Sequence, residues 1–233
     1  MCFLYLVAMK NYIFIFILSV SYLTTSQEKF SKELSFVAEN DLFVSIFQDR
    51  YYSSGLFLSY RYLSKRKSNT LEKRIIKWEL GHKMYTPYKS TITNVVDHDR
   101  PFAGYLYGSF GIDRVYKKNQ LLNTSLQVGV LGSKSLTKEL QEFIHEVYNF
   151  RKATGWEYQI KDALAVNFGV KHLKTLLKDK KNYVDLTWVN HLNFGSIFTN
   201  TASGIYARIG LKPLQKLTNT IAFNTHLNNA QNN

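Results

Sequence analysis

Apolar and polar residues alternate along most of the chain beyond its N-terminal segment. In "IKWELGHKMY", Ile76, Trp78, Leu80 and Met84 fall on one face of an extended chain, and mostly charged residues lie between them. The same period of two recurs in residues 122–130, 162–170, 182–194 and 204–211. This pattern predicts antiparallel β-strands, and we expect about eight or nine of them.

Strands of this length, separated by polar turns, occur in soluble β-sandwiches or barrels and in outer-membrane barrels. The residues between the apolar positions are mostly small or uncharged polar, as in Asn123, Ser125, Gln127 and Gly129, and not a second apolar set. Tyr and Trp lie near the predicted strand ends, which is typical of aromatic girdles. We therefore predict an all-β fold, an antiparallel transmembrane β-barrel.

One segment, "KELQEFIHEVY" (residues 138–148), has helical spacing instead. We expect Ser135 to cap this short helix and an apolar stripe to dock it, formed by Leu136, Leu140, Phe143, Ile144 and Val147. Gln141 and His145 lie one turn apart at the edge of the stripe. The pair is either part of a packed helix face or a row that faces a cleft and carries chemistry.

The composition agrees with strands, because Tyr and Phe occur 16 times each and Pro 3 times. The net charge of +13 is scattered along the chain. It indicates either a solvated basic surface or a phosphate-bearing partner such as an anionic lipid. No nucleic-acid-binding motif stands out, so we expect no nucleic-acid partner. Cys2 is the single cysteine, which excludes a disulfide framework and a cysteine-based metal site.

The N-terminus has the layout of a secretory signal peptide. Lys10 precedes the apolar run Asn11–Leu23, and small or polar residues follow up to Ser26. We predict a signal peptide at residues 1–26, with Met9 as an alternative start, and a barrel domain at residues 27–233. The alternative is a retained anchor, but the run is short for a membrane-spanning helix of about 20 residues.

Two short motifs carry oxygen-bearing side chains at predicted strand ends. Asn40 and Asp41 suit a hard cation such as Ca²⁺, although an ordinary turn has the same composition. In "YSSG", a serine (Ser53 or Ser54) has the chemistry of a ligand, a hydrogen-bond donor or a nucleophile, although most serines at strand ends are none of these.

A third motif, "DRPFAG", places Asp99 beside Arg100. This pair either braces a loop or leaves the guanidinium to bind a phosphate. Lys83 and Lys89 are nearby in the sequence and are candidate phosphate ligands as well. His82 and His98 have no partner at metal-binding spacing, so we interpret both as structural.

Taken in order along the chain, these motifs resemble one known family. They are Glu39-Asn40-Asp41, Tyr52-Ser53-Ser54-Gly55, Met84-Tyr85-Thr86-Pro87, Asp99-Arg100-Pro101-Phe102-Ala103-Gly104, Leu131-Gly132, Gln141-xxx-His145 and Gly155-Trp156-xx-Gln159. The ordered set, spread over residues 35–211, resembles the outer-membrane lipid A 3′-O-deacylase (LpxR-like) family.

The resemblance implies a twelve-stranded barrel in the outer membrane with a calcium-dependent site at its rim. It implies that Asn40 and Asp41 bind Ca²⁺, and that Gln141, His145 and Ser53, which stands for a threonine, are catalytic. Histidine suits a general base acting on water, and Ca²⁺ suits polarisation of an ester carbonyl. The substrate implied is lipid A of lipopolysaccharide.

The predicted strands end near Leu211 or Phe223, earlier than the family pattern expects. We therefore expect a barrel truncated at its C-terminus; the alternatives are closure with fewer strands, giving a monomer, or pairing with another chain. Two other functions remain open. One is a serine-type lipid esterase using Ser53 or Ser54 with His145, and the other is a catalytically inactive truncated barrel.

Overall fold

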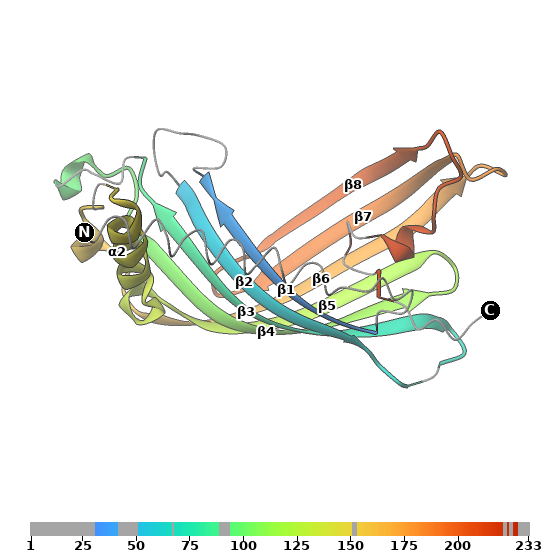
Figure 1. Cartoon of the computed structure of the whole chain (residues 1–233), viewed down its shortest axis with the longest axis horizontal. Coiled ribbons are helices and arrows are strands. Elements are labelled where there is room, and N and C mark those ends of the chain that lie inside the picture. Colours follow the sequence, from blue (N-terminus) through green and yellow to red (C-terminus); the bar gives the residue numbers. More distant parts are fainter. Residues whose placement is uncertain are drawn as a thin grey trace, which may run out of the picture. The chain divides into compact units, whose positions relative to one another are not determined.

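Eight antiparallel strands form a single sheet in the computed structural model, which describes residues 31–41, 51–66, 68–88, 94–150 and 153–220, with residues 223, 226 and 227. Each strand pairs with its neighbour in sequence (Figure 1). The strands are β1 (Lys32–Asn40), β2 (Tyr51–Leu63), β3 (Leu71–Thr86), β4 (Ala103–Tyr116), β5 (Gln120–Leu131), β6 (Ala163–Lys178), β7 (Val184–Gly195) and β8 (Asn200–Ile209). The predicted all-β antiparallel fold is confirmed, and all five alternating segments are strands.

One face of the sheet is apolar and exposed. Phe36 pairs with Leu58, and Leu58 pairs with Leu80. Side chains of directly paired residues point to the same face, so these three share one side of the sheet. They are 67%, 46% and 55% exposed. The register extends this apolar face across the sheet through Trp78, Leu126, Val128, Leu164, Phe168, Phe194 and Ile205.

The opposite, polar face carries paired charges. Glu33 pairs in register with Arg61, and Arg61 Nη1 lies 2.5 Å from Glu33 Oε1. On the neighbouring strands, Tyr107 donates to Glu79 Oε1 at 3.1 Å, and Asn123 Nδ2 donates to Asp113 Oδ1 at 2.5 Å. Buried charges need such partners, because desolvation without compensation is costly.

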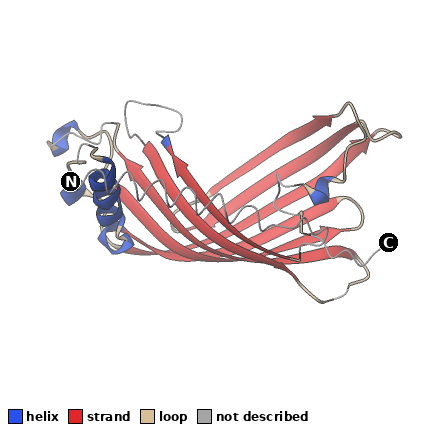
Figure 2. Ribbon diagram, viewed as in Figure 1, coloured by secondary structure: helices blue, strands red, loops and turns tan. Residues whose placement is uncertain are grey.

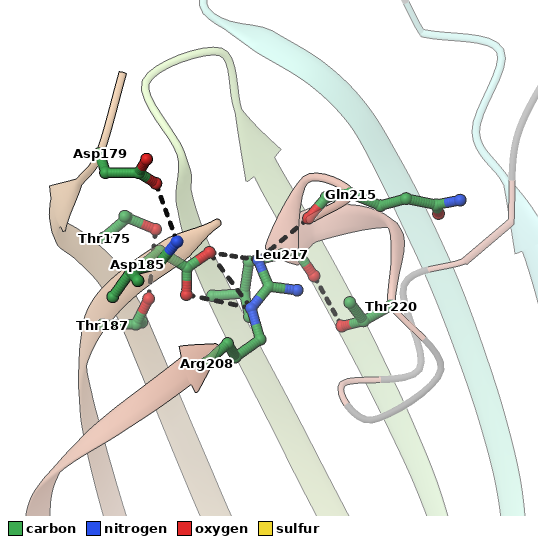
Figure 3. Close-up of polar contacts among 9 residues, drawn as sticks. Thr175, Asp179, Asp185, Thr187, Arg208, Gln215, Leu217 and Thr220 are labelled. Atoms are coloured by element: carbon green, nitrogen blue, oxygen red, sulfur yellow. Dashed lines mark hydrogen bonds and ion pairs between the residues drawn. The ribbon is translucent and has the colours of Figure 1, made fainter. Parts of the chain in front are cut away.

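Charged side chains also join the start of β7 to the end of β8 (Figure 3). Arg208 forms an ion pair with Asp185, and it also donates to the backbone oxygen of Gln215 at 3.0 Å. Asp179 accepts the backbone N–H of Val184 at 2.8 Å, which lowers the pKa of this carboxyl group. The Gln215 contact ties the segment after β8 to the strand ends, and the Asp179 contact closes the turn between β6 and β7.

Within the described residues, the helix α2 (Thr137–Tyr148) accompanies the sheet, together with four short 3₁₀ turns (Figure 2). The turns are η2 (Val95–Asp97), η3 (Gly132–Ser135), η4 (Trp156–Tyr158) and η5 (Leu217–Asn219). Over the part of the chain that the structure describes, no helix combines the length and apolar character needed to cross a membrane.

Several predictions fall on residues outside the described ones. They are the signal peptide at residues 1–26, its alternative start Met9, and the candidate phosphate ligand Lys89. The division at residue 27 and the extent of the barrel domain to residue 233 also stay predictions.

Candidate active site

Helix α2 is attached to the apolar face of the sheet at the strand ends. His82 lies two residues after Leu80 on β3, so its side chain is on the same apolar face. Its Nε2 lies 3.1 Å from the backbone oxygen of Ser135 and 2.9 Å from Thr137 Oγ1. A carbonyl oxygen only accepts, so Nε2 carries the proton. Figure 1 shows α2 beside the ends of β3 and β4, and both strands contact it.

Gly104 on β4 makes this close attachment possible. A Cβ atom at residue 104 would lie 2.0 Å from Thr137 Oγ1 and 2.1 Å from Ser135 Oγ. Any side chain would therefore push the start of α2 away from the sheet. The glycine of the "DRPFAG" motif is thus needed for steric reasons and not for its backbone conformation.

The N-terminus of α2 differs from the predicted one. The residue that caps the helix is Leu136, in the left-handed conformation (φ 56°), and it makes no side-chain capping bond. Ser135 lies inside η3, where its hydroxyl donates to the backbone oxygen of Gly132 at 2.6 Å. The prediction that Ser135 caps the helix is wrong, because His82 and Gly104 position the helix start instead.

The face of α2 that packs on the sheet is also rotated from the predicted stripe. Thr137 and Gln141 are 1% and 2% exposed. Leu136, Phe143 and Val147 are 59%, 64% and 46% exposed, although the stripe was expected to dock. The prediction of a docked stripe is therefore wrong for these three residues. The row expected at its edge, which includes Gln141, turns toward the sheet.

A small pocket lies between α2 and the ends of β1, β2 and β3. Its volume is about 30 Å³, enough for a water molecule. The pocket brings together Asn40, Gln141 and His145. Asn40 lies more than a hundred positions before the other two in the sequence. The other lining residues are Ser54, His82, Met84, Thr137, Leu140, Ile144 and Phe150.

Gln141 is held at one wall of this pocket by a residue that the sequence analysis gave no role. Trp156 in η4 donates its indole N–H to Gln141 Oε1 at 2.7 Å, and both side chains are 2% exposed. The Trp156 ring packs on Phe102 with centroids 4.7 Å apart. The one signal available in the sequence was the position of Trp156 in the "GW" motif.

His145 follows Gln141 by one turn and lines the same pocket. Its ring meets the edge of Phe150 with the two planes at 89°, and its backbone oxygen accepts the N–H of Phe150 at 2.8 Å. Asn149, left-handed at φ 57°, ends the helix and turns the chain so that Phe150 folds back. The imidazole is thus held at the pocket by the end of its own helix.

Of the two adjacent serines, Ser54 lines the pocket and Ser53 does not. The register of β2 against β3 shifts between Tyr52 and Ser54, so Ser54 pairs with Met84. Ser53 is 1% exposed, and its hydroxyl hydrogen-bonds with Thr86 Oγ1 at 2.6 Å. A β-bulge of this kind re-aims side chains next to it. The catalytic role of Ser53 stays a prediction.

Asn40 and Asp41 lie at the end of β1, where Asn40 pairs with Ser54. An amide and a carboxylate oxygen are ligand types that Ca²⁺ prefers, so the donor chemistry fits this ion. Its remaining ligands, of about six to eight oxygens in all, would come from backbone, water or substrate. Within the described part of the chain, no group of three or more His, Cys, Asp or Glu residues is placed to hold a metal.

Of the candidate phosphate ligands, the structure describes Arg100 and Lys83, and neither lines the pocket. Arg100 is half exposed, with Nε 3.3 Å from Asp99 Oδ2 and its guanidinium 4.0 Å from the Tyr51 ring centroid. Asp99 also accepts the backbone N–H of Tyr88, which lowers the pKa of its carboxyl group. Lys83 lies on the polar face, with its ammonium 5.4 Å from the Phe198 ring centroid.

An antiparallel sheet with an exposed apolar face and a charge-paired polar face is typical of the class of outer-membrane β-barrel proteins. The family model described as outer membrane protein LpxR matches residues 12–231. The chain belongs to this family, which confirms the resemblance found in the sequence.

The solved structure of LpxR from Salmonella typhimurium is similar in fold, with a TM-score of 0.62 and 20% sequence identity. The match covers 76% of this chain and 62% of that one, so this chain spans less than two thirds of the similar structure. A comparison with curated proteins found no significant match.

Proposed function

We propose that this protein hydrolyses an ester-linked acyl group of lipid A, by 3′-O-deacylation, in the outer membrane. The observation that carries the proposal is the gathering of Asn40, Gln141 and His145 in one pocket on the apolar face. In an outer-membrane barrel the apolar face contacts lipid. A pocket on that side suits a substrate that is itself a membrane lipid.

His145 is the proposed general base. Its imidazole takes a proton from a water molecule, and the water oxygen attacks the ester carbonyl carbon. When the tetrahedral intermediate collapses, the bond to the sugar oxygen breaks and the acyl group leaves as a carboxylic acid. The same imidazole returns its proton to the sugar oxygen. Gln141 orients the water or the ester by hydrogen bonds.

Asn40 and Asp41 are the residues proposed to hold Ca²⁺. When bound, the ion would polarise the ester carbonyl and stabilise its developing negative charge. Leu140, Ile144 and Met84 give the pocket apolar walls, which would keep bulk water away from the reacting ester.

The proposed partners are lipid A and the surrounding outer membrane, reached by export through the predicted signal peptide. The net charge of +13 agrees with a phosphate-bearing lipid substrate. Arg100, half exposed at the strand ends, is one candidate phosphate ligand, and Lys83 is another. A barrel that closes on itself would function as a monomer.

A second candidate is a serine-type esterase, which the position of Ser54 favours. Ser54 lines the pocket with His145 and would act as a nucleophile with the imidazole as its base. The buried hydrogen bond of Ser53 with Thr86 makes Ser54 the better nucleophile of the two. A serine-reactive phosphonate separates the mechanisms, since it labels an activated serine and leaves a calcium–water enzyme active.

The full chain in detergent, mixed with lipid A and Ca²⁺, tests the proposal by mass spectrometry of the lipid product. We expect loss of one acyl group, no loss after His145→Ala, and normal loss after His191→Ala. His191 is exposed on β7 and is not among the residues that line the pocket. If the wild-type protein leaves the acyl pattern of lipid A unchanged, the proposal is wrong. The remaining interpretation is then a catalytically inactive barrel.

A further inference from the structure

Trp156 contacts Gln141 across fifteen positions of sequence through a buried hydrogen bond. We propose that Trp156 is a positioning residue that fixes the side-chain amide of Gln141, so that Gln141 serves the reaction as a hydrogen-bond donor. This inference rests on the proposed function and adds to it. It assigns a role to Trp156 and restricts the role of Gln141.

The orientation follows from the chemistry of the two groups. An indole N–H can only donate, and a glutamine amide has one accepting end and one donating end. The Trp156 Nε1 atom lies 2.7 Å from Gln141 Oε1. A flipped amide would place two N–H-bearing atoms against each other and leave both N–H groups without this bond, which is costly in a buried position.

The donating end of Gln141 is therefore the end that points away from Trp156. It can donate to the ester carbonyl oxygen or to the oxygen of the attacking water. Gln141 Oε1 does not take the proton of that water, because a neutral amide oxygen is too weak a base. Proton removal is left to His145, which lines the same pocket one turn along α2.

Trp156 can fix the amide because its own ring is fixed. It belongs to a buried cluster with Met84 and Phe102, and the Phe102 ring lies 4.7 Å from it. The backbone oxygen of Phe102 accepts the N–H of Ile160 at 2.9 Å, which ties the chain after η4 to the "DRPFAG" motif. A donor held on two sides in this way is preorganised for Gln141.

The approach to Trp156 also depends on Gly155. Its φ of 101° lies in the region that favours glycine, and a Cβ atom there would lie 2.5 Å from His98 Cε1. The structural interpretation of His98 agrees with this contact, since its ring also packs against Phe102. The "GW" pair is thus a turn that delivers one indole N–H to the pocket wall.

Trp156→Phe tests the inference because it keeps an aromatic ring against Phe102 and removes the donor. We expect kcat for lipid A deacylation to fall about tenfold to a hundredfold with KM nearly unchanged, since the amide is misplaced and not lost. Trp188→Phe is the matched control. The Trp188 indole on β7 donates to Ser203 Oγ on β8 at 2.9 Å, and neither residue lines the pocket. The activity of this variant should stay normal.

A double-mutant cycle separates positioning from mere structural support. If Trp156 acts through Gln141, Trp156→Phe causes no further loss of kcat in a Gln141→Ala background. A full multiplicative loss in that background would overturn the inference. So would wild-type kcat in Trp156→Phe.

Absence of deacylation by the wild-type protein would overturn the proposed function but not the positioning of Gln141 by Trp156. A spectroscopic measurement tests this positioning without any activity. In protein labelled with ¹⁵N-glutamine, the chemical shifts of the Gln141 side-chain amide report its hydrogen-bonded surroundings. We expect these shifts to move toward those of a solvent-exposed glutamine in Trp156→Phe and to stay in place in Trp188→Phe. Unchanged Gln141 signals in Trp156→Phe would overturn the positioning role.

Discussion

Ser53 and Thr86 hydrogen-bond to each other through their hydroxyl groups at 2.6 Å, and both are almost fully buried. The β-bulge in β2 turns Ser53 to this partner and leaves Ser54 at the pocket. Adjacent serines of one motif thus have different surroundings, and they should respond differently to substitution.

Ser53→Ala should lower the free energy of unfolding by about 1–3 kcal/mol, because it leaves a buried hydroxyl of Thr86 without its partner. Ser53→Thr keeps the hydroxyl and is the control. Under the proposed calcium–water mechanism, Ser54→Ala should retain most deacylase activity. Denaturant unfolding and product analysis measure the two effects. Complete inactivity of a folded Ser54→Ala protein would favour the serine-type esterase.

Gly104→Ala should displace the start of α2 and reduce activity strongly. The added Cβ atom would collide with Thr137 Oγ1 at 2.0 Å, and overpacking of this kind typically costs about 1–3 kcal/mol. Gly108→Ala, on the same strand, is the matched control, since its Cβ atom would meet nothing within 4 Å. Limited proteolysis across residues 132–148 measures the displacement. Equal proteolysis of the two variants would contradict the steric role of Gly104.

The turn before α2 should loosen in acid. Asp162 accepts the hydroxyl of Ser133 at 2.9 Å and the N–H of Lys134 at 3.3 Å, and the first of these bonds is the main cause of its lowered pKa. A carboxyl group whose pKa is lower when folded stabilises the fold above its unfolded pKa of about 4. That contribution is lost as the pH falls through the folded pKa.

Hydrogen exchange of the η3 amides at neutral and acid pH measures this loss. We expect faster relative exchange in acid for the wild type and little pH dependence of protection in Asp162→Asn, where the charge is already absent. The exchange has to be compared after correction for its intrinsic pH dependence. An identical acid response in both proteins would exclude Asp162 as its source.

The strands and the helix could be predicted from the sequence because both follow from local periodicity. Side chains alternate between faces of a pleated strand and recur every three to four residues on a helix. The one-turn spacing of Gln141 and His145 therefore carried over directly into the structure. The apolar and polar faces of the sheet could also be predicted, because apolar and polar residues alternate along each strand.

Details that depend on contacts distant in sequence could not be predicted. The β-bulge, which exchanges the surroundings of Ser53 and Ser54, leaves no mark in the residue pattern. The docking face of α2 is set by His82 on β3 and Gly104 on β4, which are distant from the helix in sequence. Trp156 reaches Gln141 because the chain after α2 folds back, and helical periodicity says nothing about that return.

The most direct test of the central claim is mass spectrometry of lipid A incubated with the purified full chain, with Ca²⁺ present or chelated. The account predicts release of one ester-linked acyl group that depends on Ca²⁺, and its loss in His145→Ala with the protein still folded. Release that continues equally in the chelator, or in His145→Ala, would contradict it.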